Sequence, residues 1–322
     1  MSTLVDRHGA GLEPSRGDGV PQAASARGPG RRLWHAIEPF VVTARPRQWL
    51  KNGLVLAAPT AAGMLLKPRI DLLALLAVGS FTLAAIATYF VNDAVDAPAD
   101  RLHPVKSRRP VAAGLITPRA AVIAGLVCGV GAMAIALSLG WAFTAMVGAY
   151  LALTALHSLR LKQVPVLDIL VVAGCFLLRA AGGGVATGVQ LWNWFLLVAL
   201  FGSLFLVTAK RAAEQGRDPT GTHARTTLDA YPASWLQQVM TVSLTGTLMG
   251  YALWAFRYVG LDIDKPLINA SLLPFLAVLL RYSLLVSEGD GEQPERLLTR
   301  DRFLIAAAGT WAALVIAGIY LG

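Results

Sequence analysis

The sequence predicts an all-α membrane protein whose helices cross the bilayer several times. Of its 322 residues, 55% are hydrophobic, and the mean hydropathy is +0.57. A soluble domain of this length is more polar, so this composition indicates several membrane spans. Apolar stretches long enough to cross a bilayer recur from about residue 50 to the end, and none shows the alternating pattern of a strand.

These stretches predict nine transmembrane helices. Short breaks separate them, such as Lys67-Pro68 after the first and Gly140-Trp141 after the third. Both cysteines, Cys128 and Cys175, lie inside apolar runs, which predicts small core residues. The predicted spans are 50–66, 71–95, 118–139, 141–159, 165–187, 192–213, 236–258, 266–287 and 302–321.

Positive charges predict how the helices are oriented. The net charge is +9, yet one set of alternate loops carries few of the 28 Lys and Arg residues. Those few are Lys67, Arg69, Arg257 and Lys265. The positive-inside rule therefore places the N-terminus in the cytoplasm and, after nine spans, the C-terminus outside the plasma membrane. The polar residues concentrate on the cytoplasmic side, which favours an enzyme working at one face over a transporter.

The N-terminal segment has a different composition. Residues 1–30 are rich in Gly, Ala, Ser, Pro and Arg and contain no apolar run. Such a segment cannot bury enough surface to fold, and it lacks the apolar core of a cleaved signal peptide. We therefore expect a disordered cytoplasmic tail over residues 1–30 and a single membrane-embedded catalytic domain over residues 31–322.

The second predicted span ends in an acidic motif. Its polar side chains are Tyr89, Asn92, Asp93, Asp96 and Asp100. They share one face, because residues three and four apart are neighbours on a helix. Acidic groups at a helix C-terminus oppose its dipole and repel one another unless a cation joins them. A set of oxygen ligands suits Mg²⁺, so we expect Asn92, Asp93 and Asp96 to bind the metal and Asp100 to assist. The alternative is a solvated helix end.

A basic loop follows this motif directly. It contains Lys106, Arg108 and Arg109. A metal bridges carboxylates to phosphate while cations neutralise the remaining oxygens, so acids followed by bases suit a magnesium–diphosphate complex. We expect Lys106 and the aspartates to act in catalysis and Lys106 and Arg109 to bind diphosphate. The alternative is positive-inside charge alone.

The stretch from Asn92 to Pro110 resembles the first motif of the UbiA superfamily of intramembrane prenyltransferases. The resemblance covers about residues 40–322 and implies a nine-helix bundle that uses Mg²⁺. Most members carry a second aspartate motif after the sixth helix. This chain has Lys210, Arg211 and Glu214 there, which cannot form a second carboxylate metal site but could bind a phosphate directly.

One branch of the superfamily is more similar: the actinobacterial enzymes that transfer 5-phosphoribose from phosphoribosyl pyrophosphate to decaprenyl phosphate for cell-wall arabinan. The similar stretches are 45–52, 89–100, 202–214 and 298–302. The resemblance implies a phosphoribosyl donor and a polyprenyl phosphate acceptor, with pyrophosphate released and no nucleic acid bound. The alternatives are a prenyltransferase that joins a prenyl diphosphate to a small acceptor, and a non-enzymatic transporter. The oligomeric state stays open.

Further polar residues are expected to bind substrate. Arg179 lies within a span, where an unpaired charge is costly, so it is either functional or paired with Asp168. The remaining candidates are Lys51 for the diphosphate, Tyr89 for a hydrogen bond to the donor, and Lys162, Lys210 and Arg211 for the 5-phosphate or the lipid phosphate.

Overall fold

The computed structural model describes residues 29–217, 228–257, 266–289, 297 and 300–321. Within the described residues, those from Pro39 onward form one compact unit, which contains η1 and all later helices. The predicted tail lies outside the described residues except for its last two, because α1 spans Pro29–Ala44. The expectation that the tail is disordered therefore stays a prediction.

Eight helices in the described ranges are long and apolar enough to cross a membrane, and those ranges contain no strand. The all-α membrane fold is thus confirmed, and these eight match the second to ninth predicted spans. They are α3 (Pro68–Arg101), α4 (Pro118–Ser138), α5 (Trp141–Leu159), α6 (Leu167–Thr187), α7 (Asn193–Arg217), α8 (Ala233–Arg257), α9 with α10 (Pro266–Ala270 and Leu272–Ser287) and α12 (Arg302–Tyr320).

The first predicted span differs from expectation. Instead of one long α-helix over 50–66, the chain forms a 3₁₀ helix, η1 (Pro46–Leu56), followed by the short α2 (Ala57–Ala61). Gly53 and Pro59 explain this local choice, since both residue types disfavour an α-helix interior. At the usual rises per residue, η1 and α2 together are about 30 Å long, close to the hydrocarbon thickness.

This irregular segment passes from one end of the bundle to the other. Arg45, just before η1, contacts Asp93 near the C-terminal end of α3, and Gly63, just after α2, lies against Ile319 at the opposite end. Non-helical backbone is tolerated at membrane depth only where protein or water surrounds it. Here η1 packs against α3 and α6, and we infer that it takes the place of the first predicted span.

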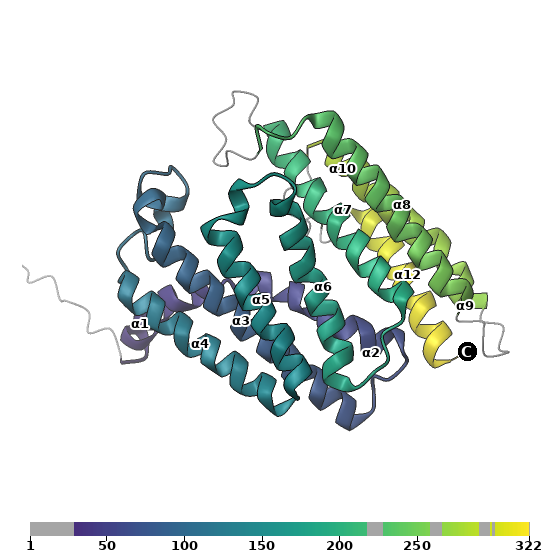
Figure 1. Ribbon diagram of the computed structural model, residues 1–322, viewed down its shortest axis with the longest axis horizontal. Helices are drawn as coiled ribbons and strands as arrows, with labels where there is room; N and C mark the ends of the chain where they lie inside the picture. The colour runs from purple at the N-terminus through teal and green to yellow at the C-terminus, as the bar shows by residue number, and fades with distance from the viewer. Residues whose placement is uncertain (1–28, 218–227, 258–265, 290–296, 298–299, 322) are drawn as a thin grey trace, which may run out of the picture. The chain divides into compact units, whose positions relative to one another are not determined.

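Helix α6 is the centre of this packing. It contacts α3, α5, α7, η1 and α2, and the helices from α3 to α8 lie beside one another in chain order (Figure 1). A Cβ atom on Gly183 would lie 1.7 Å from the carbonyl oxygen of Val55, so only glycine at this position admits η1 so closely. The glycine run of α6 therefore makes room for the irregular crossing.

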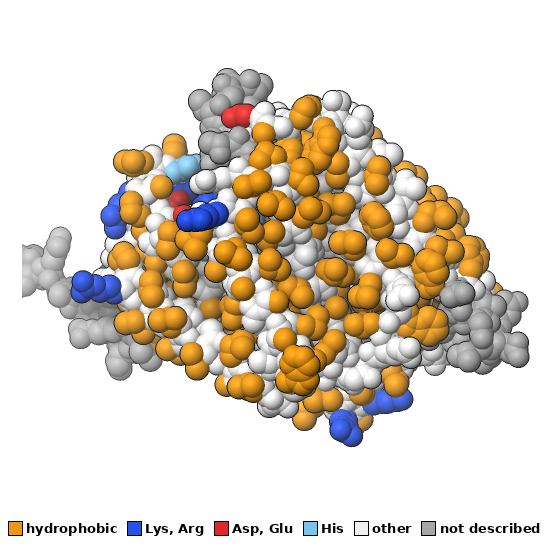
Figure 2. Space-filling model, in the orientation of Figure 1, with side chains coloured by type: hydrophobic (Ala, Val, Ile, Leu, Met, Phe, Trp, Pro, Cys, Tyr) orange, Lys and Arg blue, Asp and Glu red, His pale blue; other side chains and the backbone are white. Residues whose placement is uncertain are grey.

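The molecular surface agrees with a membrane location. Figure 2 shows a broad hydrophobic face, with Lys, Arg, acidic and His side chains gathered mainly near one end of the helices. Large apolar side chains such as Val127, Val130 and Val242 are more than half exposed, as expected for residues that face lipid.

Candidate active site

The acidic motif lies on the last three turns of α3 and is partly covered by the loop that follows. Asp93 and Asp100 are buried, whereas the side chain of Asp96 is 40% exposed. Arg109 follows η2 (Lys106–Arg108) and donates to Asp93 at 3.3 Å and to Asp100 at 2.7 Å. The predicted acid and base clusters therefore meet in space, with one guanidinium bridging two carboxylates.

A second arginine reaches the same carboxylate. Arg45 donates to Oδ1 of Asp93 at 2.6 Å, and its guanidinium lies 5.0 Å from the centre of the Tyr89 ring. Its φ of +53° is left-handed, an uncommon conformation for a residue other than glycine. The sequence-based site did not include Arg45. Arg45 lies in the stretch 45–52, which resembles UbiA enzymes, but nothing in that stretch predicts the left-handed turn that directs its side chain to Asp93.

Two other predicted residues lie around this motif. Lys162, in η3 (Leu161–Gln163), places its Nζ 3.8 Å from Oδ1 of Asp96. Both side chains are more than a third exposed, so the pair is weak and its members can turn to a ligand. Lys106 begins η2 in the same loop as Arg109, while Lys51 lies within η1, six residues after Arg45.

The side chains suit a metal ion whose remaining ligands come from the substrate. Across the described part of the chain, no three His, Cys, Asp or Glu side chains form a ready-made metal site. The acidic motif nevertheless offers the amide oxygen of Asn92 and the carboxylates of Asp93 and Asp96 within two helical turns. Magnesium is typically held by one or two carboxylates together with substrate phosphates, so this donor set fits Mg²⁺.

A different environment surrounds the cations that replace the second aspartate motif. Arg211 is 3% exposed and donates to both oxygens of Asp168, at 2.8 and 3.2 Å, and to Glu214 at 2.8 Å. His157 contacts the same Asp168 carboxylate at 2.9 Å. Lys210 lies 3.7 Å from Glu214, but its side chain is 43% exposed. The two adjacent cations thus differ: Arg211 joins α6 to α7, whereas Lys210 is accessible.

Arg179 occupies a separate polar cluster deeper in the bundle. It donates to Asn52 of η1 and to the Tyr150 hydroxyl, both at 2.8 Å, and to the carbonyl of Cys175. Asn52 in turn donates to Thr82 of α3. Thr82 precedes Asp93 by eleven residues, about 16 Å along the helix. The alternative pairing of Arg179 with Asp168 is therefore wrong, since Arg211 takes that partner, and Arg179 lies well away from the acidic motif.

Sequence reasoning missed Asn52 and Tyr150 as partners of Arg179. Asn52 had a signal, because it is a polar residue inside a stretch read as apolar. Tyr150 had none, since a tyrosine within an apolar helix is ordinary core.

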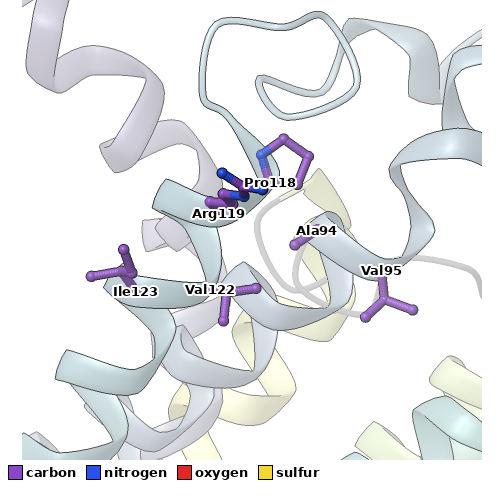
Figure 3. Close-up of a pocket in the computed structure, with 6 residues that line it drawn as sticks. All are labelled: Ala94, Val95, Pro118, Arg119, Val122 and Ile123. Atoms are coloured by element: carbon purple, nitrogen blue, oxygen red, sulfur yellow. The ribbon is translucent and has the colours of Figure 1, made fainter.

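A hollow of about 440 Å³ lies on another side of α3 (Figure 3). It is lined by Ala94, Val95, Pro118, Arg119, Val122 and Ile123. Val95 follows Asp93 by two residues, which turns it about 200° around the helix axis. The hollow is therefore separate from the carboxylate face.

Comparison with known proteins places the chain in a family. The profile of the UbiA prenyltransferase family matches residues 56–318. The chain belongs to this family. It is 39% identical to the decaprenyl-phosphate phosphoribosyltransferase of Corynebacterium glutamicum, over 88% of this chain and 87% of that protein. It is 40% identical to the enzyme of the same name from Mycobacterium tuberculosis, over 88% and 94% of the two chains.

A solved structure agrees with the family's fold. A UbiA homolog from Archaeoglobus fulgidus, bound to GPP and Mg²⁺, superposes with a TM-score of 0.65 at 20% identity. The match covers 87% of this chain and 99% of that one. At this identity the likeness establishes the fold, and the chemistry of this UbiA family transferase must be argued from its own residues.

Proposed function

We propose that this UbiA family member transfers 5-phosphoribose from phosphoribosyl pyrophosphate to a polyprenyl phosphate such as decaprenyl phosphate and releases pyrophosphate. The observation that carries the proposal is identity of 39–40%, over most of both chains, to enzymes named for this reaction. A residue in the C-terminal half of α7 supports it. Lys210 stands where a two-metal prenyltransferase would need carboxylates, and an accessible cation suits a donor with a separate 5-phosphate.

The α3 motif is assigned to the pyrophosphate half of the donor. Asn92, Asp93 and Asp96 would hold Mg²⁺, which supplies positive charge to stabilise the leaving pyrophosphate. Arg109 and Lys106 lie in the adjoining loop and would neutralise the remaining oxygens. Asp100 holds Arg109 at 2.7 Å, so its role is to aim that guanidinium.

The remaining cations are assigned to the other phosphates. Lys162 and Lys210 are partly exposed and come from η3 and α7, so they would contact the 5-phosphate or the lipid phosphate. Lys51 and Tyr89 complete the donor pocket in this proposal. Arg211 and Arg179 are assigned supporting roles, because each is buried and fully engaged by protein groups.

These residues suit a displacement that needs no general base. An oxygen of the polyprenyl phosphate, already anionic, attacks C1 of the ribose while the bond from C1 to pyrophosphate breaks. Positive charge develops at C1 and the ring oxygen, as in glycoside chemistry. In-line attack on an α-configured donor gives a β-configured product. The cationic side chains bind both anions and stabilise charge on the departing group.

The location of the site is also part of the proposal. The loops after α3, α5, α7 and α10 would face the cytoplasm, and the C-terminus would lie outside the plasma membrane. The product would serve synthesis of cell-wall arabinan. The charge asymmetry of the loops supports this orientation. Single cysteines in the loop 101–116 should react with an impermeant reagent only when the inner membrane face is accessible. Labelling from outside intact cells would show that the orientation is the reverse of the one proposed.

The reaction is tested with purified protein, labelled phosphoribosyl pyrophosphate and decaprenyl phosphate. We expect a labelled lipid and pyrophosphate in equal amounts, with product formation lost on chelation of Mg²⁺. Geranyl diphosphate with a small aromatic acceptor is the competing assay. Turnover of the prenyl donor without turnover of the ribosyl donor would replace this proposal with prenyl transfer.

A further inference from the structure

The connection between α5 and α6 contains a strained turn. Val166 has φ +67° and ψ −49°, and the amide of Leu167 donates to the carbonyl of Pro165 at 2.8 Å. This is a γ-turn with positive φ, which is rare and strained in proteins. Valine is an unfavourable residue for it, because its branched Cβ crowds the backbone when φ is positive. Some interaction outside the turn must hold it.

The Tyr231 hydroxyl supplies that interaction. It accepts a hydrogen bond of 2.8 Å from the amide of Val166. Tyr231 lies just before α8, is 3% exposed, and stacks on Trp235 with 8° between the rings. Its carbonyl accepts from Gln215 of α7 at 2.7 Å. Burial raises the pKa of Tyr231, so its hydroxyl stays neutral. Contacts with Gln215 of α7 and Trp235 of α8 hold the residue in place independently of the turn.

The turn ends the short connection that carries Lys162. This connection runs from residue 160 to residue 166, and Nζ of Lys162 reaches to 3.8 Å from Asp96 on α3. Directly beyond the turn, Asp168 is held by Arg211 and His157. Because the start of α6 is fixed, the backbone conformation at Val166 sets the direction of residues 160–166. It therefore also sets where Lys162 lies relative to the acidic motif.

We propose that Tyr231 is a positioning residue, whose hydroxyl holds the γ-turn at Val166 and thereby sets Lys162 beside Asp96 to receive a substrate phosphate. This inference rests on the phosphoribosyl transfer proposed above and deepens it. It assigns a role in substrate binding to a residue that contacts the start of α6 and not the metal motif itself. The competing explanation is that Tyr231 stabilises the fold and leaves substrate binding unaffected.

The test compares Tyr231→Phe with Lys162→Gln. The first removes one oxygen atom and keeps the ring stacked on Trp235. We expect it to raise KM about fivefold to tenfold, the effect of one lost hydrogen bond, and to change kcat by less than about twofold. Lys162→Gln should raise KM for the same substrate, whether phosphoribosyl pyrophosphate or decaprenyl phosphate. The double variant should be no worse than the more affected single variant, because both changes remove one contact.

A rescue separates positioning from simple stability. Glycine adopts positive φ at little cost, so in Val166→Gly the turn should depend less on the Tyr231 hydroxyl. The side chain of Val166 is 45% exposed, so its removal opens no core cavity. In the Tyr231→Phe background, Val166→Gly should recover much of the lost affinity, measured also by calorimetric binding of the substrate whose KM had risen. Recovery in the double variant also guards against the case in which Tyr231→Phe folds poorly.

Tyr251→Phe is the matched control. Tyr251 is equally buried, and its hydroxyl contacts Ser271 at 2.6 Å and Trp311 at 2.9 Å, far along α8 from the site. It should lower the thermal midpoint and leave both KM values unchanged. The inference is overturned if Tyr231→Phe behaves like this control, or if Lys162→Gln leaves both KM values unchanged. A wild-type protein that does not use phosphoribosyl pyrophosphate would overturn the proposed function instead, and this inference with it.

Discussion

Two groups of acids and arginines lie at the end of the bundle where α3 and α7 end, and they differ in how exposed their arginine side chains are. The α3 cluster contains Arg45, Asp93, Asp100 and Arg109, and the α7 cluster contains Asp168, Arg211 and Glu214. The arginine side chains of the α3 cluster are 33% and 30% exposed. In the α7 cluster, the Arg211 side chain is 4% exposed and that of Asp168 is fully buried.

We interpret this difference as separating the proposed binding site from a structural anchor. A guanidinium that is about one third exposed can leave a carboxylate and turn to a phosphate, because water stabilises the intermediate arrangement. A sealed ion pair cannot exchange partners without exposing an uncompensated charge in a low dielectric. On this interpretation, similar side chains serve opposite purposes: one set binds substrate and the other stabilises the fold.

The largest effect is expected at Asp96. Asp96→Asn should lower turnover about 100-fold or more, because a neutral amide holds Mg²⁺ more weakly than the carboxylate it replaces. Its side chain is 40% exposed, so the thermal midpoint should stay close to that of the wild type. Turnover and thermal unfolding are measured on the same preparation. The matched control is Asp71→Asn, at the other end of α3, and equal activity of the two variants would refute the metal assignment.

Breaking the α7 cluster should mainly affect stability. Arg211→Gln leaves Asp168 buried without its strongest partner, so the free energy of unfolding should fall by about 3–5 kcal/mol. Replacing both residues by apolar ones, Arg211→Met with Asp168→Leu, should recover much of that loss. Denaturant unfolding in detergent measures both. If Arg211→Gln unfolds like the wild type but raises KM for phosphoribosyl pyrophosphate, the assignment of the α7 cluster as an anchor is wrong.

Lys210 should show the opposite pattern from its neighbour. Lys210→Gln should raise KM for phosphoribosyl pyrophosphate about tenfold, the loss of one charge-assisted phosphate contact, with the dependence on Mg²⁺ kept. Its stability should hardly change, since its ion pair with Glu214 is accessible to water. Arg119→Gln, an exposed cation at the start of α4, is the control. Equal KM values for the two variants would leave Lys210 as a headgroup anchor.

The sequence predicted the helices well because their signal is local. The bounds of α4 and α5 agree with prediction to within one residue, since apolar length and Pro or Gly breaks determine them. The first span was misjudged because hydropathy does not distinguish a 3₁₀ helix from an α-helix. Only the contact of Val55 with Gly183, far apart in sequence, explains how that segment is accommodated.

The acidic motif was predictable for a similar reason, since spacing on one helix places its residues on one face. The roles of the cations were harder, because they depend on partners from other helices. Lys210 and Arg211 are adjacent in sequence and look interchangeable there, yet Arg211 is buried against Asp168 whereas Lys210 is exposed beside Glu214. Sequence alone could not assign one to a ligand and the other to the fold.

The smallest effect is expected at an ion pair that lies outside both clusters. Asp301, before α12, pairs with Arg281 of α10 at 2.6 Å and accepts from the amide of Leu304 at 2.7 Å. The hydrogen bond from Arg281 and that amide hold the pKa of Asp301 below its usual value of 3.8. A lowered pKa in the folded state means that the pair stabilises the fold above pH 3.8 and that this contribution is lost as the pH falls through the lowered value.

At neutral pH, Asp301→Asn should therefore change the thermal midpoint only slightly, because water screens the pair and asparagine still caps the helix. Asp301→Ala removes the cap as well and should lower the midpoint further. Below the folded-state pKa of Asp301, the wild type and Asp301→Asn should converge, since both then carry a neutral side chain. Thermal unfolding of the three proteins across this pH range is the measurement. A large loss in Asp301→Asn at neutral pH would show that exposure does not divide these ion pairs as the α3 and α7 clusters suggest.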